Sequence, residues 1–154
     1  MNYQTKILLA SFITLVCNTQ TKAQNTCSIT YNTDSTLSTL IDNKGFSFDN
    51  YDKVCQLLKN ANASIDIQTV TQITPYQTTA AVSIRLKARE IDAQKVRIFS
   101  YASNWVRFDE ERTSSTEKDA LYNVTMSALN GINQEMVDDL NKQRSYLKSY
   151  KPSK

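Results

Sequence analysis

The stretch Tyr76–Lys87, YQTTAAVSIRLK, decides the fold. Its alternate residues divide into two sets, of which only one is mainly apolar. The apolar set is Tyr76, Thr78, Ala80, Val82, Ile84 and Leu86; the other is Gln77, Thr79, Ala81, Ser83, Arg85 and Lys87. Because side chains alternate between the faces of a strand, this period of two predicts a strand with one core face and one solvated face.

Two further strands are predicted on either side of this one. Ser64–Ile73 is rich in β-branched residues and ends before Pro75, which cannot continue a strand ladder. Gln94–Phe108 predicts the third strand, but its pattern changes phase. Val96 and Ile98 share one face, whereas Phe99, Tyr101 and Trp105 share the other. Either a bulge shifts the phase or both faces of this strand are covered.

The residues before these strands predict a short helix and weaker elements. Apolar residues recur at helical spacing from Tyr51, so a helix is expected to begin at Asp49–Asp52 and to end near Asn60–Asn62. Ser28–Tyr31 predicts a short strand. Leu37–Ile41 and Gly45–Phe48 flank polar residues and predict a loose hairpin.

A long amphipathic helix is predicted at the C-terminal end. Ser114 and Glu117 fit a capping box with Ser114 as the N-cap, and apolar residues then recur every three or four positions. Gly131 predicts a bend. A helix continued to Leu147 would run roughly 50 Å, more than a small sheet can cover, so its end should project, bend or fray.

Together these elements predict an α+β fold. We expect a single antiparallel sheet of about three to five strands, with a short helix and a long amphipathic C-terminal helix packed on it. The chain divides into a signal peptide (1–23), one α+β domain (24–141) and a basic C-terminal tail (142–154).

Residues 1–23 are typical of a secretory signal peptide. Lys6 precedes an apolar run of 11 residues, Ile7–Cys17, which is too short to cross a bilayer as a helix. Small residues before a cut after Ala23 predict cleavage there, which would place the protein in the periplasm or outside the cell. One alternative is a lipoprotein modified at Cys17, although Val16 is larger than the residue expected before such a cysteine. A buried N-terminal strand or helix is another.

Removal of 1–23 would leave two cysteines, Cys27 and Cys55. An even pair in an exported chain predicts one disulfide. This bridge would tie the N-terminus of the mature chain to the helix that contains Cys55. A redox-active pair is disfavoured because the sequence contains no C-x-x-C motif.

The charges are distributed unevenly. The whole chain has 18 Lys and Arg against 15 Asp and Glu, but the tail carries five bases and no acid. These bases are Lys142, Arg144, Lys148, Lys151 and Lys154. A slightly acidic body with a basic tail is not typical of a nucleic-acid-binding protein. The tail would suit anionic lipid or an acidic partner, and the simpler interpretation is a solvated end.

Several classes of chemistry are excluded by composition. Without histidine there is no Ser-His or Cys-His dyad and no zinc-protease motif, and two distant glycines cannot form a phosphate-binding loop. We predict no metal site and no cofactor. A small hydrolase based on carboxylates remains an alternative, with Glu90, Glu110 and Glu117 as equal candidates.

The aromatic residues of the third strand, Phe99, Tyr101, Trp105 and Phe108, form the most interesting patch. If the helices cover only one face of the sheet, a partner could contact Arg97, Phe99, Tyr101, Trp105 and Arg107. The alternative is that the rings pack as core under the final helix.

The overall plan resembles the small periplasmic accessory proteins of type IVb pilus operons, of the bundle-forming or toxin-coregulated kind. The resemblance rests on Met1–Ala23, on the short mature chain with Cys27 and Cys55, and on the basic C-terminus through Lys154. It implies an exported, non-catalytic assembly factor with a protein partner in the cell envelope, accessory to pilus or secretion-machine biogenesis. A periplasmic immunity or inhibitor protein against a toxin or hydrolase is the alternative.

Overall fold

The computed structural model describes residues 27–90 and 96–149. The predicted signal peptide, its cleavage site and Cys17 lie outside these residues, as do Lys151 and Lys154 of the predicted tail. Along the chain the elements are β1 (Tyr31–Asn32), α1 (Ser35–Lys44), α2 (Tyr51–Asn60), β2 (Ala63–Ile73), β3 (Thr78–Ala88), β4 (Ser103–Asp109), α3 (Ser114–Asn130) and α4 (Gln134–Ser149).

The four strands form one sheet in the order β1-β2-β3-β4. The α+β class and the single sheet are as predicted, but the sheet is mixed rather than antiparallel. β1 pairs in parallel with β2, with Tyr31 opposite Ile65, whereas the other two pairings are antiparallel. Two helices separate β1 from β2 along the chain, and such a crossover is what a parallel pairing requires.

β3 is one of the two interior strands, and its alternation is confirmed. The even-numbered residues from Thr78 to Ala88 are buried, while the odd-numbered residues between them are only half-buried. Tyr76, which the pattern placed on the core face, precedes the strand and is exposed. The apolar residues of all four helices join the even-numbered face of β3 in one core. The helices therefore lie on one face of the sheet.

The predicted hairpin between Leu37 and Phe48 is wrong, because Ser35–Lys44 form α1. Asp34 caps this helix: its carboxylate accepts hydrogen bonds from the backbone N–H groups of Thr36 (2.8 Å) and Leu37 (3.0 Å). Gly45 ends the helix with a φ of 91°, a conformation that glycine adopts readily.

The predicted disulfide is present between Cys27 and Cys55, whose Cα atoms are 6.0 Å apart. Cys55 lies on the buried side of α2, and the Tyr51 hydroxyl donates a hydrogen bond to the Cys27 carbonyl (3.3 Å). The bridge thus fixes the segment before β1 to α2. Disulfides of this kind are typical of oxidising compartments.

The predicted long helix is two helices, α3 and α4, which meet at the bend expected near Gly131. Thr113, rather than Ser114, is the N-cap of α3, and its hydroxyl accepts from the N–H of Thr116. α4 continues to Ser149, across the predicted start of the tail at residue 142. Arg144 ties this part of α4 to the body, since its Nε lies 2.6 Å from Glu90 Oε1.

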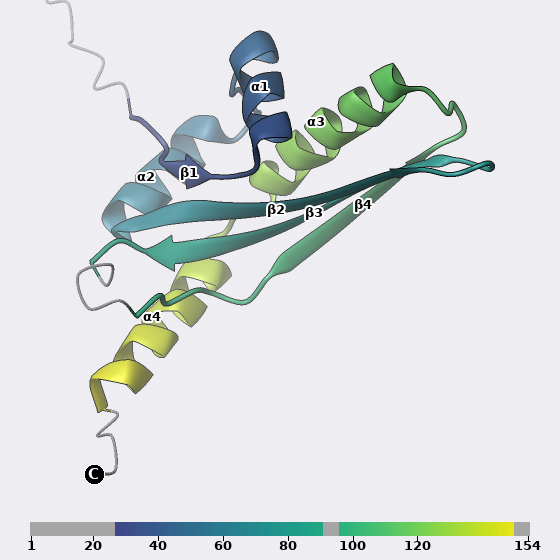
Figure 1. Cartoon of the computed structure of the whole chain (residues 1–154). Helices are drawn as coiled ribbons and strands as arrows, with labels where there is room; N and C mark the ends of the chain where they lie inside the picture. The colour runs from purple at the N-terminus through teal and green to yellow at the C-terminus, as the bar shows by residue number, and fades with distance from the viewer. Residues whose placement is uncertain (1–26, 91–95, 150–154) are drawn as a thin grey trace, which may run out of the picture.

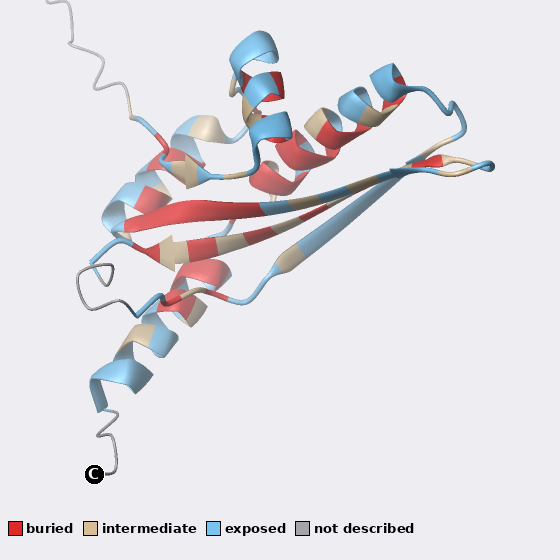
Figure 2. Cartoon of the chain, viewed as in Figure 1, coloured by how far each residue is buried: buried red, intermediate tan, exposed pale blue. Residues whose placement is uncertain are grey.

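Figure 1 shows β2 and β3 as a long hairpin, with β4 along its outer edge and α3 running beside it. The two described ends of the chain lie at the same side of the molecule, opposite the hairpin tip. Burial is concentrated in the half of the sheet near α2, while β4 is exposed along most of its length (Figure 2). Within the described residues, no helix has the length and apolar character needed to cross a membrane.

Candidate interaction surface

The predicted phase change in the third strand is a one-residue slip in register. Phe99 lies opposite Lys87 in an isolated bridge, and Ser103 lies opposite Ile84 at the start of β4. Ser103 is four residues after Phe99, whereas their partners on β3, Ile84 and Lys87, are only three residues apart. The extra residue acts as a β-bulge does and reverses which residues face the helices.

This slip separates the predicted aromatic patch. Phe99 is opposite Lys87, on the face away from the helices, whereas Trp105 is opposite Val82, on the helix side. Arg107 shares the helix side with Trp105 and is exposed. The Trp105 ring contacts the turn between α3 and α4, where a Cβ on Gly131 would lie only 3.0 Å from Cζ2. The rings therefore do not share one face, contrary to the sequence prediction.

The other two predicted residues lie in the segment before β4. Arg97 is exposed. The backbone N–H of Tyr101 donates to the Asp139 carboxylate of α4 (2.6 Å). Burial, and then the nearby carboxylates of Glu135 and Asp139, raise the pKa of the Tyr101 hydroxyl. Tyr101 thus belongs to the surroundings of α4 rather than to a strand face.

The exposed apolar residues of the sheet lie instead on the face away from the helices, called here the open face. Val70 of β2, Ala81 of β3 and Val106 of β4 lie directly opposite one another across three strands. Phe108 lies two residues beyond Val106 on the same face. We call these four residues the apolar strip. Val70, Val106 and Phe108 are 69%, 54% and 62% exposed, so among the described residues no element covers them.

The strip is bordered by uncharged polar residues and includes a shallow depression of about 270 Å³. The exposed neighbours on the same face are Gln68, Gln72 and Asn104. An apolar centre with a polar rim is the usual arrangement of a protein–protein contact.

The other half of the open face is polar and internally paired. Arg85 Nη2 lies 2.7 Å from Asp66 Oδ2, and Asn32 donates to the other oxygen of the same carboxylate (3.2 Å). The Arg85 guanidinium also lies 4.4 Å from the centre of the Phe99 ring, in a cation–π arrangement. Phe99 is therefore already engaged within the chain.

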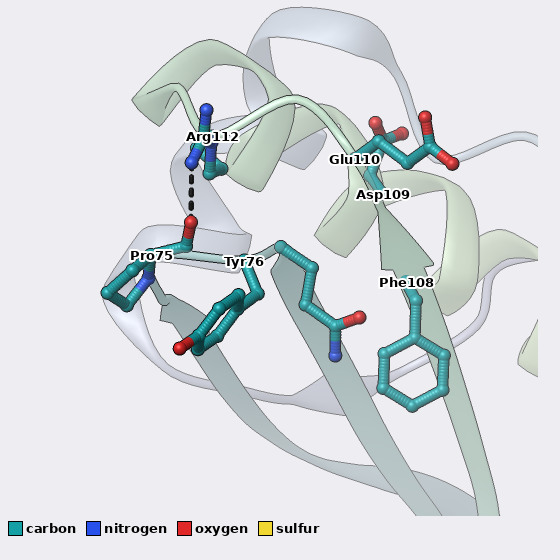
Figure 3. Close-up of a pocket in the computed structure, with 7 residues that line it drawn as sticks. Pro75, Tyr76, Phe108, Asp109, Glu110 and Arg112 are labelled. Atoms are coloured by element: carbon teal, nitrogen blue, oxygen red, sulfur yellow. Dashed lines mark hydrogen bonds between the residues drawn. The ribbon is translucent and has the colours of Figure 1, made fainter.

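A second hollow, of about 700 Å³ and open to solvent, lies at the end of β4 beside the β2–β3 turn. Figure 3 shows the rings of Tyr76 and Phe108 on one side and the carboxylates of Asp109 and Glu110 pointing away from them. Arg112 donates a hydrogen bond to the Pro75 carbonyl and so ties the loop before α3 to this turn. The hollow extends the exposed aromatic surface beyond the strip.

The three carboxylates considered for catalysis do not form one cluster, because Glu90 lies far from Glu110. Glu90 follows the last residue of β3 and pairs with Arg144, whereas Glu110 follows Asp109, which lies opposite the first residue of β3. A strand of this length separates them by roughly 35 Å. Glu117 lies in the first turn of α3. Within residues 27–90 and 96–149, no three acidic or cysteine side chains are grouped as a metal site.

Of the four residues of the apolar strip, only Phe108 belongs to the aromatic set that the sequence singles out, and Ala81 is predicted only on the solvated face of its strand. Val70 is flanked by Thr69 and Thr71 in its strand, and Val106 and Phe108 lie in a strand whose phase the sequence leaves open. A tight turn around Pro75 would pair Val70 with Ala81, and this pairing is the one sequence feature that could have indicated the strip.

Comparison of the chain with models of known protein families, with curated proteins and with solved structures found no match.

Proposed function

We propose that this protein is an exported, non-catalytic interaction factor of the cell envelope whose protein partner binds the open face through the apolar strip. The observation that supports the proposal is the alignment of Val70, Ala81 and Val106 across three strands, with Phe108 beside them and the four described helices on the other face. A role accessory to the assembly of a pilus or a secretion machine is the specific form of this proposal.

The strip has the physical properties that a partner could use. Burial of an exposed Val or Phe side chain stabilises a complex by up to about 1.5–3 kcal/mol. The strands already order the backbone of these residues, so little backbone entropy is lost when a partner binds. The rim of Gln68, Gln72 and Asn104 would supply hydrogen bonds without the cost of desolvating a charge.

The disulfide supports the envelope as the location. Cys27 and Cys55 are joined, and such bonds persist in oxidising compartments such as the bacterial periplasm. Identification of the N-terminal residue of the mature protein tests this part. Cleavage after Ala23 would begin the mature chain at Gln24; retention of Met1 would contradict export, and a lipid-modified Cys17 would indicate an anchored form.

Site-specific photo-crosslinking in living cells tests the surface. A photoreactive amino acid at Gln68 borders the strip without altering it, and the same amino acid at Gln56, an exposed position on α2, is the matched control. We expect Gln68 to crosslink to one discrete envelope protein, Gln56 not to, and Val70→Glu to abolish the product. Equal crosslinking from both positions, or a product that persists with Val70→Glu, would contradict the proposal.

A further inference from the structure

The sheet has two edges, and they differ greatly in length. β1 forms one edge with only two residues, whereas β4 forms the other with seven. No described strand pairs with the outer side of β4. Proteins usually protect such an edge with proline, lysine, a bulge or a covering segment, because its free backbone groups can pair with another chain. Ser103–Asp109 contains no proline or lysine, and the register slip lies before it.

The hydrogen bonds at the end of β3 show which of its residues face β4. The Leu86 carbonyl accepts from the Ser100 N–H (2.9 Å), and the Ala88 N–H donates to the Ile98 carbonyl (3.1 Å). Leu86 and Ala88 therefore point their backbone polar groups toward the β4 side. Since this direction alternates along an antiparallel strand, the other even-numbered residues of β3 do the same.

The free backbone groups of β4 can be assigned from this alternation. The even-numbered residues of β3 lie opposite Ser103, Trp105, Arg107 and Asp109. The intervening residues, Asn104, Val106 and Phe108, therefore direct their N–H and C=O groups away from β3. All three are exposed, so they present an unpaired ladder to any incoming strand.

The sequence of β4 is complementary to itself in one register. Two copies of β4 related by a two-fold axis normal to the sheet run antiparallel, and the axis passes between one residue and its own copy. With the axis at Val106, Val106 lies opposite Val106 of the second copy, and Asn104 lies opposite Phe108. Each residue with outward backbone groups then has a partner. An axis at Arg107 would oppose two guanidinium groups, and one at Phe108 would oppose Val106 and Glu110.

The helix side of β4 also fits this register. Trp105 would lie opposite Arg107 of the second copy, twice per interface by symmetry, and a guanidinium beside an indole ring is a favourable pair. After removal of 1–23, the chain would carry 16 bases and 15 acids, so net repulsion between copies is negligible.

We propose that β4 pairs with β4 of a second copy about a two-fold axis at Val106, which joins two four-stranded sheets into one of eight strands. The apolar strip would then continue from Val70 of one copy, through the two Val106 residues, to Val70 of the other. Because two seven-residue strands bury little surface, we expect a reversible dimer with a dissociation constant in the micromolar range.

Sedimentation of the exported protein, with its disulfide intact, tests the pairing. Asn104→Pro removes an outward N–H that β3 does not use, and Asn104→Ala is the matched control. We expect Asn104→Pro to raise the dissociation constant at least about tenfold and Asn104→Ala to change it less than about threefold. A wild-type protein that stays monomeric up to about 1 mM, or a dimer indifferent to Asn104→Pro, would overturn the proposal.

Engineered cysteines test the register independently of any effect of proline on folding. Directly opposite Cα atoms in a hydrogen-bonded pair are about 5.5 Å apart, within the range of a disulfide. Val106→Cys should therefore form a disulfide dimer readily, and Asn104→Cys alone should not. A mixture of Asn104→Cys and Phe108→Cys should link. If Val106→Cys links no faster than Asn104→Cys, this register is wrong.

The outcomes remain separable from those of the proposed function. Val70 lies on β2, two strands from the free edge, so Val70→Glu should leave sedimentation unchanged while it abolishes the crosslink from Gln68. A wild-type protein that stays monomeric but keeps the crosslink from Gln68 would overturn only the pairing of β4.

Discussion

Reduction of the Cys27–Cys55 disulfide should lower the free energy of unfolding by about 3–4 kcal/mol. The two cysteines are 28 residues apart and enclose β1, α1 and the first part of α2. In the chain-entropy model, a closed loop of this length removes about 12 cal/mol/K from the unfolded chain, or about 3.6 kcal/mol at 25 °C. Reduction should act mainly on the unfolded chain, which gains conformational entropy when the bridge is broken. The folded state should change little, because the Tyr51–Cys27 hydrogen bond and the core contacts of α2 do not need the bridge.

Urea unfolding at neutral pH, followed by circular dichroism with and without reductant, measures this loss. For a protein of this size, with a slope of roughly 1.5–2 kcal/mol/M, the midpoint should fall by about 2 M. The double variant Cys27→Ala/Cys55→Ala is the control and should unfold near the reduced wild type. A midpoint shift below about 0.5 M would mean that the bridge does not restrict the unfolded chain, and the loop-entropy reasoning would be refuted.

Three further substitutions test local features of the fold. Asp34→Ala should cost about 1 kcal/mol at neutral pH; burial alone would raise the pKa of this carboxyl, but hydrogen bonds from the Thr69 hydroxyl and from backbone N–H groups outweigh it and lower the pKa. Its contribution is therefore present above the unfolded value of about 3.9 and lost as pH falls through the lower folded pKa, so wild type and variant should converge in acid denaturation; a constant difference would contradict this. Leu86→Ala should cost about 2–5 kcal/mol in urea unfolding because its side chain is fully buried, whereas Ser83→Ala on the opposite face should cost less than about 1 kcal/mol; equal losses would show that the two faces are misassigned. Gly131→Ala should displace the ring of Trp105, the chain's single tryptophan, and so shift its fluorescence emission; an unchanged spectrum would argue against this contact.

The elements with a clear hydrophobic period were predictable from the sequence. The alternation from Thr78 to Lys87 gave β3 and its buried face, because a period of two has one interpretation over that length. The helix from Tyr51 was predicted for the same reason, with apolar residues at three- and four-residue spacing. The cysteine pair was predictable because only two cysteines remain after residue 23.

The elements that depend on distant partners were not predictable. Leu37, Leu40 and Ile41 have helical spacing, but the run is short, and the capping role of Asp34 is evident only from its hydrogen bonds. β1 has two residues, too few for a period, and its parallel direction follows from the return of the chain through α1 and α2.

The candidate surface was only partly predictable. The sequence leaves open whether the aromatic residues of the third strand are exposed or core, and it places Phe99 and Trp105 on one face. Their positions depend on the register with β3, which a single extra residue reverses. The strip combines Val70 with Val106, 36 positions later in the sequence, and such a pairing arises from the sheet topology rather than from a local pattern.

The slip between Phe99 and Ser103 makes the length of this segment matter more than its composition. Loss of one residue there would turn Val106 and Phe108 toward the helices and turn Trp105 and Arg107 toward the open face, although the sequence of β4 itself would be unchanged. In evolution, this loop should therefore tolerate replacements far better than insertions or deletions. An insertion or deletion of one codon would exchange the residues of β4 that face the helices with those on the open face.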